Sequence, residues 1–225
     1  MRMRFPLSVT AIVVLASGCA GGGVSNLRTQ VESLPAPERA YITGTYAVDC
    51  RASGKDCKQA FDIISLDYRV VGKPELMGRM NWTEGSLTVP ATVVDSLDLS
   101  AGRKETYFCI AVPPGDLEFY TYSYYSSSRG DYVIPRTDYF SLPFSVARGE
   151  VRDIGHLRLT VTAGKNAFGI TLPAPGELQV SASKPNESAA ALAKCPESAR
   201  NGKRTVEQLR VPSSKQTKYV REIAR

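Results

Sequence analysis

Short runs of β-branched and aromatic residues, separated by turn sequences, follow one another from residue 41 to residue 183. The clearest runs are 61–71, 86–94, 105–112, 117–125, 139–146, 151–162 and 177–183. Regularly spaced short strands with turn signals are typical of an antiparallel sandwich or barrel. No helical pattern of similar strength competes, which argues against a parallel α/β sheet. The sequence therefore predicts an all-β fold, an antiparallel β-sandwich over residues 41–183.

The beginning of the chain has the pattern of an export signal. Arg2 and Arg4 precede an apolar stretch at 5–16. That stretch is about 18 Å long as a helix, too short to cross a hydrocarbon core of about 30 Å. A basic start, a short apolar stretch and small residues at its end indicate a signal peptide over residues 1–18. Residues 19–40 are rich in Gly, Ser and Pro and predict a flexible tether. Within it, 26–34 could form a short helix that Pro35 and Pro37 end.

The end of this signal, LASGC at 15–19, resembles the lipobox of bacterial lipoproteins, with Ala16 where Leu is most usual. In that family the cysteine thiol receives a diacylglyceryl group, the chain is cut just before it, and the new amine is acylated, commonly with palmitate. The resemblance implies lipid attachment at Cys19 and a membrane partner through that lipid. Ala20, in place of the Asp that favours inner-membrane retention, points to the outer membrane, facing the periplasm. The alternative is an ordinary secretory signal cut nearby, with Cys19 incidental.

Four further cysteines remain if Cys19 carries lipid: Cys50, Cys57, Cys109 and Cys195. An even number in an exported chain suggests two disulfides. Zinc is the alternative use of four cysteines, but it usually takes closely spaced pairs that this chain lacks. The turn-rich link between Cys50 and Cys57 favours a bridge across that hairpin, which leaves Cys109 to pair with Cys195.

Two stretches, ETYFCIAVPPGDLEFYTYSYY at 105–125 and YFSLPFSVARGEVRDIGHLRLTV at 139–161, resemble a bacterial envelope domain. The family is the transthyretin-like, carboxypeptidase-regulatory-like β-sandwich of envelope lipoproteins, largely of unknown function. Its turn chemistry is visible in Pro113 and Pro114, which fix φ, and in Gly115, which supplies a positive φ. The resemblance implies a transthyretin-like or immunoglobulin-like sandwich and brings no catalytic residues.

Few residues suggest chemistry. His156 is the single histidine, lies in a predicted strand, and has no GxSxG serine or metal-ligand pattern to accompany it. There is no phosphate loop or dinucleotide fingerprint. The sequence therefore predicts no enzyme and no cofactor or metal.

Three tyrosines of one predicted strand, Tyr120, Tyr122 and Tyr124, share a face. An exposed row of aromatic rings could stack against sugar rings. The alternative is that this face is the buried side of the sandwich or a solvated tyrosine ladder.

The positive charge is concentrated at the C-terminus. The chain has a formal net charge of +6, and the stretch 196–225 carries most of it. Residues 184–225 predict a short helix at 188–194, with Ser188 as its N-cap, followed by a poorly ordered basic tail. The tail either docks on anionic headgroups, lipopolysaccharide or cell-wall polymers, or only solubilises. Its candidate contacts are Lys203, Arg204, Arg210, Lys215, Lys218, Arg221 and Arg225.

Together these features predict a lipid-anchored envelope lipoprotein that acts as a non-enzymatic binding or structural module in the periplasm. Its partner is an unknown envelope protein or cell-wall polymer, and the compartment excludes nucleic acid. The alternative function is a carbohydrate- or lipopolysaccharide-binding accessory lipoprotein that uses the tyrosine face and the basic tail.

Overall fold

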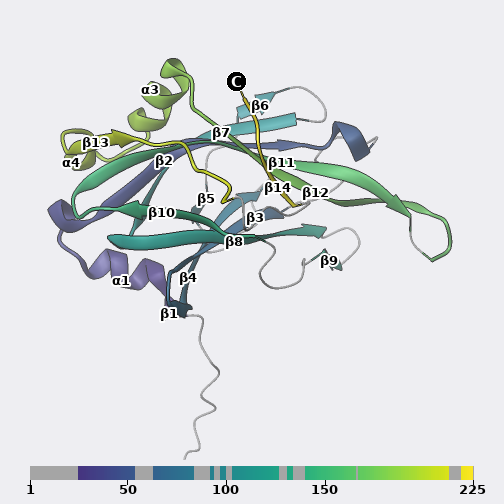
Figure 1. The fold of residues 1–225 in the computed structure, drawn as a ribbon, viewed down its shortest axis with the longest axis horizontal. Coiled ribbons are helices and arrows are strands. Elements are labelled where there is room, and N and C mark those ends of the chain that lie inside the picture. Colours follow the sequence, from purple (N-terminus) through teal and green to yellow (C-terminus); the bar gives the residue numbers. More distant parts are fainter. Residues whose placement is uncertain are drawn as a thin grey trace, which may run out of the picture.

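The computed structural model of the chain describes residues 25–53, 63–83, 92–93, 97–99, 103–126, 131–133, 140–165, 167–212 and 219–224. Within them the chain forms two β-sheets that pack face to face, with two helices, α3 and α4, over the outer face of one sheet (Figure 1). The all-β, two-sheet architecture predicted from the strand pattern is therefore confirmed.

The first sheet, sheet A, has the order β1 (Ser25–Asn26), β4 (Lys73–Thr83), β3 (Ile63–Val70), β8 (Gly115–Ser126) and β10 (Leu142–Val146), with β5 (Thr92–Val93) beside β4 and β9 (Asp131–Val133) beside β8. Sheet B has the order β14 (Val220–Glu222), β12 (Thr171–Ser181), β11 (Glu150–Lys165), β2 (Ala40–Asp49), β7 (Arg103–Val112) and β6 (Leu97–Leu99), with β13 (Lys203–Val206) beside β11. The helices are α1 (Leu27–Ser33), α3 (Pro185–Ala193) and α4 (Glu197–Arg200), with short 3₁₀ turns η1 (Ala36–Glu38) and η2 (Arg51–Ser53).

Strand direction departs from the antiparallel prediction. At the centre of sheet B, β2 is antiparallel to β7 but parallel to β11. At the side of the sheet, β13 and β14 are parallel to β11 and β12. Parallel neighbours need a long connection between them. The chain between β2 and β11, which includes β7 and every strand of sheet A except β1, provides that connection.

The core lies between the inner faces of the two sheets. Its largest fully buried side chains come from both sheets and are at most 1% exposed: Ile42, Tyr46, Phe108, Ile64, Leu66, Met80, Phe119, Tyr122 and Tyr124. These residues alternate along their strands with outward-facing ones, as expected for a sheet with one buried face.

Strand β2 is unusual because both of its faces are buried over all ten residues. Its inner face joins the main core, and its outer face lies under the helical layer. A second, smaller apolar cluster lies there, formed by Tyr41, Val151, Cys195 and Ala199 with Cys109, Ala111 and Leu192 packed against them. Sheet B is therefore enclosed on both sides where the helices cover it.

A disulfide joins this helical layer to the sheet. Cys109 of β7 is bonded to Cys195, which lies between α3 and α4 and is 86 residues further along the chain. This is the pairing predicted from the sequence. Cys50 is buried and also disulfide-bonded, but its predicted partner, Cys57, lies outside the described residues.

The short helix predicted at 188–194 is observed as α3, but its start and the segment after it differ from the prediction. Helix α3 begins at Pro185, with Lys184 as N-cap, and the Glu187 carboxylate accepts a bond from the Lys184 backbone N–H at 3.1 Å. Proline suits the first helical position because its missing N–H would have no partner there. Beyond α4, β13 and β14 pair with the sandwich. The prediction of a poorly ordered tail is wrong for residues 198–212 and 219–224.

The tether prediction is wrong for the part of 19–40 that the structure describes. Leu27 and Val31 of α1 are buried, Leu27 within the main core, and β1 pairs with β4. An apolar helix face that packs on the sandwich outweighs the flexible composition around it. The predicted signal peptide, Cys19 and the next few residues lie outside the described residues.

Strand β11 changes partners at Gly155. Residues Glu150 to Asp153 pair with β13, and the pairing with β12 begins at His156. Gly155 has a φ of 99°, and a Cβ there would lie 2.4 Å from the Ser181 carbonyl oxygen. Only glycine fits this close approach with a positive φ. The irregularity allows the C-terminal segment to enter the sheet beside the first half of β11.

We predict that the double substitution Cys109→Ala and Cys195→Ala lowers the free energy of unfolding by about 2–5 kcal/mol, because it releases a long loop closure. Equilibrium urea unfolding of the oxidised proteins measures this change. Under reducing conditions the parent and the variant should agree, since both then lack the bond. Equal stability of the two oxidised proteins would contradict the prediction.

Candidate functional site

A pocket of about 250 Å³ lies between α3 and β13, over the outer face of sheet B. Its lining residues are Thr43, Val151, Asp153, Ser188, Ala189, Leu192, Arg204, Thr205 and Val206. They come from β2, β11, α3 and β13, so the pocket exists only where the C-terminal segment lies on the sheet. Its size suits a side chain or a small ligand group rather than a whole polymer.

Asp153 is the buried charged residue of this pocket. Its side chain is held by three donors, and the residue is 5% exposed. The backbone N–H of Gly155 and the hydroxyl of Ser183 each donate to Oδ1 at 2.9 Å. The Ser188 hydroxyl of α3 donates to Oδ2. Hydrogen bonds offset much of the cost of burying a carboxylate, and all three donors here are uncharged groups.

These bonds also position the pocket wall. Ser188 lies one turn into α3, so its bond to Asp153 fixes the helix against β11. On the other side, the Thr205 hydroxyl of β13 donates to the Glu150 carboxylate of β11. Burial opposes the ionisation of Glu150, but the bonds from Thr205 and the Ala147 N–H, together with Arg152, outweigh it and lower the pKa of this carboxyl. Both walls are thus tied to the same strand.

Basic and apolar side chains also line the pocket. Arg204 is one of them, and its guanidinium donates to the carbonyl oxygen of Arg200. Val206 also lines the pocket and is one of the large apolar side chains that the described surface leaves exposed. The lining therefore combines the buried Asp153 carboxylate with a guanidinium and apolar side chains.

His156 belongs to a separate polar cluster on the same face of sheet B. It is 1% exposed and lies in register between Thr45 of β2 and Ser181 of β12. Its Nε2 atom lies 4.0 Å from Oε2 of Glu105. The types Ser, His and Glu are those of a hydrolase triad. Here the serine and the histidine are buried within a continuous sheet, so they offer no surface to a substrate in this conformation.

The tyrosine row does not form an exposed face. Tyr122 and Tyr124 are fully buried and point into the core. Their hydroxyls cross the sandwich and donate to backbone carbonyls of sheet B, Tyr122 to Gly176 at 2.6 Å and Tyr124 to Thr160 at 3.1 Å. Of the two sequence alternatives, the buried face is observed, and the sugar-stacking surface is not present.

Tyr120 lies on the opposite face from Tyr122, although both are even-numbered. The register between β3 and β8 shifts between the pairs Asp67–Thr121 and Tyr68–Phe119, which reverses the alternation, so Phe119 points inward. Arg69 lies 4.5 Å above the Tyr120 ring, and the tyrosine hydroxyl contacts the Met77 sulfur at 3.7 Å. Tyr120 is 7% exposed, so it is covered as well.

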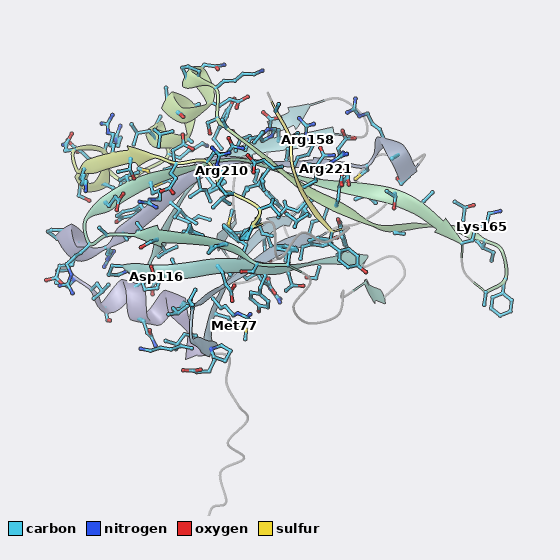
Figure 2. All side chains as sticks on the ribbon, viewed as in Figure 1. Met77, Asp116, Arg158, Lys165, Arg210 and Arg221 are labelled. Carbon is cyan, nitrogen blue, oxygen red and sulfur yellow. A yellow bond between two sulfur atoms is a disulfide. The ribbon has the colours of Figure 1, made fainter. Side chains whose placement is uncertain are left out.

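The C-terminal cations are partly neutralised. Arg210 pairs with Glu222 at 2.8 Å, and Arg221 pairs with Glu177 at 2.6 Å. Such exposed pairs contribute little stability, but they reduce the free positive charge of the segment. Figure 2 shows Arg210 and Arg221 on the side of the molecule where the C-terminal strands lie. Three other predicted basic contacts, Lys215, Lys218 and Arg225, lie outside the described residues.

The described residues contain neither a metal-binding cluster nor a membrane-spanning helix. Their His, Cys, Asp and Glu side chains form no group of three or more that is arranged to hold a metal ion. None of their helices is long and apolar enough to span a membrane.

Comparison with known proteins gives no family assignment. No protein-family model matches the chain, and neither a curated protein nor a solved structure matches it.

Sequence reasoning identified the disulfide that anchors the pocket but missed the pocket itself. Asp153 stands between Arg152 and Ile154 in a strand, where an outward-facing carboxylate is usually solvated. Ser183 and Ser188 lie 30 and 35 residues further on, at the end of a predicted strand and at the start of a predicted helix. No local signal indicated that this segment folds back over β11.

We predict that Tyr122→Phe and Tyr124→Phe each lower the free energy of unfolding by about 0.5–1.5 kcal/mol, because each leaves a buried carbonyl without its donor. Tyr46→Phe is the matched control. The buried Tyr46 hydroxyl has no hydrogen-bond partner in the described part of the chain, so its removal should be neutral or stabilising. Urea unfolding measures all three, and equal losses would contradict the assignment.

We also predict that stability falls as the pH rises above about 10. Burial raises the pKa of Tyr68 to about 12, and burial, followed by the nearby Tyr122 and Tyr46, raises the pKa of Tyr124 well above its usual value. The folded protein therefore binds more protons than the unfolded chain, and its stability is complete only below the unfolded pKa. Melting temperature as a function of pH measures the loss. A Tyr124→Phe variant should show a smaller loss above pH 10, and an unchanged slope would count against the argument.

Proposed function

We propose that this chain is a lipid-anchored lipoprotein of the bacterial cell envelope that acts as a non-enzymatic binding module in the periplasm. The lipobox-like sequence that ends at Cys19 supports the anchor. The disulfide between Cys109 and Cys195 supports an oxidising compartment, because such bonds persist outside the cytosol. Ala20 supports an outer-membrane location.

We further propose that the sandwich is of the transthyretin-like type. The support is the turn between β7 and β8, where Pro113 and Pro114 precede Gly115, which has a φ of 129°. Two β-sheets packed face to face are compatible with this type. Domains of this kind serve as scaffolds on which separate sites are built.

The single observation that carries the binding role is the pocket between α3 and β13, with a buried carboxylate inside it. A concave site with apolar walls and a few convergent polar groups is the usual form of a ligand site. Asp153 favours a ligand group that donates hydrogen bonds or carries positive charge, since all its donors in the described structure are neutral. A primary amine of a cell-wall peptide, or a lysine side chain of an envelope protein, has this chemistry.

We predict that soluble cell-wall peptide fragments with free amines shift the amide resonances of Val151, Ser188 and Thr205, and that acetylated fragments do not. Ala189→Trp should abolish the shifts, because a large side chain at this exposed pocket position fills the space. Ala193→Trp is the matched control, since Ala193 is an exposed residue of α3 outside the pocket. Equal shifts in both variants would contradict the pocket assignment.

The anchor is tested separately. Cells that express the chain and are fed an alkyne palmitate should label the parent protein, and Cys19→Ser should abolish the labelling and release the protein from the membrane fraction. Labelling that persists in Cys19→Ser would contradict the proposed anchor and leave the binding experiment unaffected.

A further inference from the structure

Strands β11 and β12 extend beyond the sandwich as a two-stranded arm. Strand β2 accompanies β11 as far as Thr160, and β14 accompanies β12 from Leu178 onward. Between Val161 and Pro175 the two strands pair only with each other among the described residues. Figure 1 shows this hairpin projecting far from the rest of the molecule. An isolated two-stranded hairpin is marginally stable in water, so an arm of this kind gains from a surface that covers it.

The tip of the arm exposes large apolar side chains. Phe168 is 86% exposed and Ile170 is 56% exposed. They lie in the turn, on either side of Gly169, which has a φ of 76°. Of the four large apolar side chains exposed on the described surface, two are therefore at this tip. Concentrated exposure of this kind marks a contact surface.

The charge of the arm suits contact with an anionic lipid surface. From 160 to 176 the sequence contains no Asp or Glu and one cation, Lys165. Figure 2 shows Lys165 at the far end of the arm, next to the turn. An aromatic and an aliphatic side chain with a neighbouring lysine suit the boundary between lipid headgroups and acyl chains, where each cation near an anionic surface adds attraction.

The backbone of the arm disfavours the addition of a partner's β-strand along its edge. Pro173 and Pro175 pair with Ala163 and Val161 and contribute no N–H groups to β12. Proline in an edge strand discourages the addition of another strand. A partner that extends the sheet along this arm is therefore disfavoured, and contact through the apolar tip is favoured.

We propose that the β11–β12 tip is a membrane-contact site that inserts Phe168 and Ile170 into the interfacial region of a phospholipid bilayer. The proposal rests on the proposed envelope location, which brings a bilayer within reach. Under this proposal, the lipid on Cys19 and the tip of the arm contact a membrane at two separate points. Together they would limit how the sandwich and its pocket are oriented.

The test uses the full mature chain with Cys19→Ser, so that binding by the lipid does not mask the tip. Vesicles of equimolar phosphatidylethanolamine and phosphatidylglycerol are the probe, and flotation measures bound protein. We expect this protein to float with the vesicles, and Phe168→Asp to reduce its partition coefficient about tenfold or more, because an exposed ring no longer enters the interface. Ile170→Asp should cause a smaller loss.

Val71→Asp is the matched control. Val71 is 49% exposed and lies in the turn between β3 and β4, where its backbone N–H bonds to the Asp116 carbonyl. Figure 2 shows Asp116 well away from Lys165. This variant should float as well as its parent, and circular dichroism should show all variants folded. A Phe168→Trp variant should also be quenched by brominated lipid beyond the background from Trp82, the sole tryptophan of the parent.

Two results would overturn the proposal. One is equal flotation of parent and Phe168→Asp, or no flotation of either. The other is concentration-dependent self-association that Phe168→Asp abolishes while vesicle binding is absent, which would assign the tip to a second copy of the chain. Neither result depends on palmitate labelling at Cys19 or on the pocket shifts, so failure of this proposal and failure of the proposed function are distinguishable.

Discussion

The disulfide between Cys109 and Cys195 is the constraint on which the outer layer of the molecule depends. It fixes the connection between α3 and α4 to β7, and from that point the chain continues as β13 along the first half of β11. The helices bury the outer face of β2, which would otherwise be solvated. The pocket then lies between α3 and β13, and both walls come from the C-terminal segment.

Hydrogen bonds also hold the outer layer on sheet B. Asp153 accepts bonds from β11, from residue 183 and from α3, and Glu150 accepts a bond from Thr205 of β13. A similar arrangement holds the two sheets together at the root of the arm, where Tyr122 and Tyr124 reach backbone carbonyls of sheet B. In both places a polar side chain bonds to backbone at a register shift of β11, at Gly155 in the first and at Thr160 and Gly176 in the second. The pocket and the arm therefore depend on the same long strand.

Much of the fold was predictable because alternating apolar residues and turn sequences are local signals. The strands that contain Cys109, Tyr122 and Leu157 follow from them, and the Cys109–Cys195 bond follows from the number and spacing of the cysteines. Strand direction in sheet B was not predictable, because no local pattern distinguishes a parallel neighbour from an antiparallel one. The tyrosine row illustrates a second limit. An alternating row of Tyr120, Tyr122 and Tyr124 fits an exposed ladder and a buried face equally well, and a register shift between β3 and β8 places Tyr120 on the other side. The C-terminal segment was missed because its order comes from packing and from the disulfide, whereas its polar composition predicts disorder.

The most direct test of this account is amide hydrogen exchange of the oxidised parent compared with the Cys109→Ala, Cys195→Ala variant. If the disulfide holds the pocket layer on the sandwich, protection should fall further across 184–212 than in β3 and β8, where the loss should not exceed the change in the free energy of unfolding. An equal loss of protection in 184–212, β3 and β8, or full protection of 184–212 in the variant, would contradict the account.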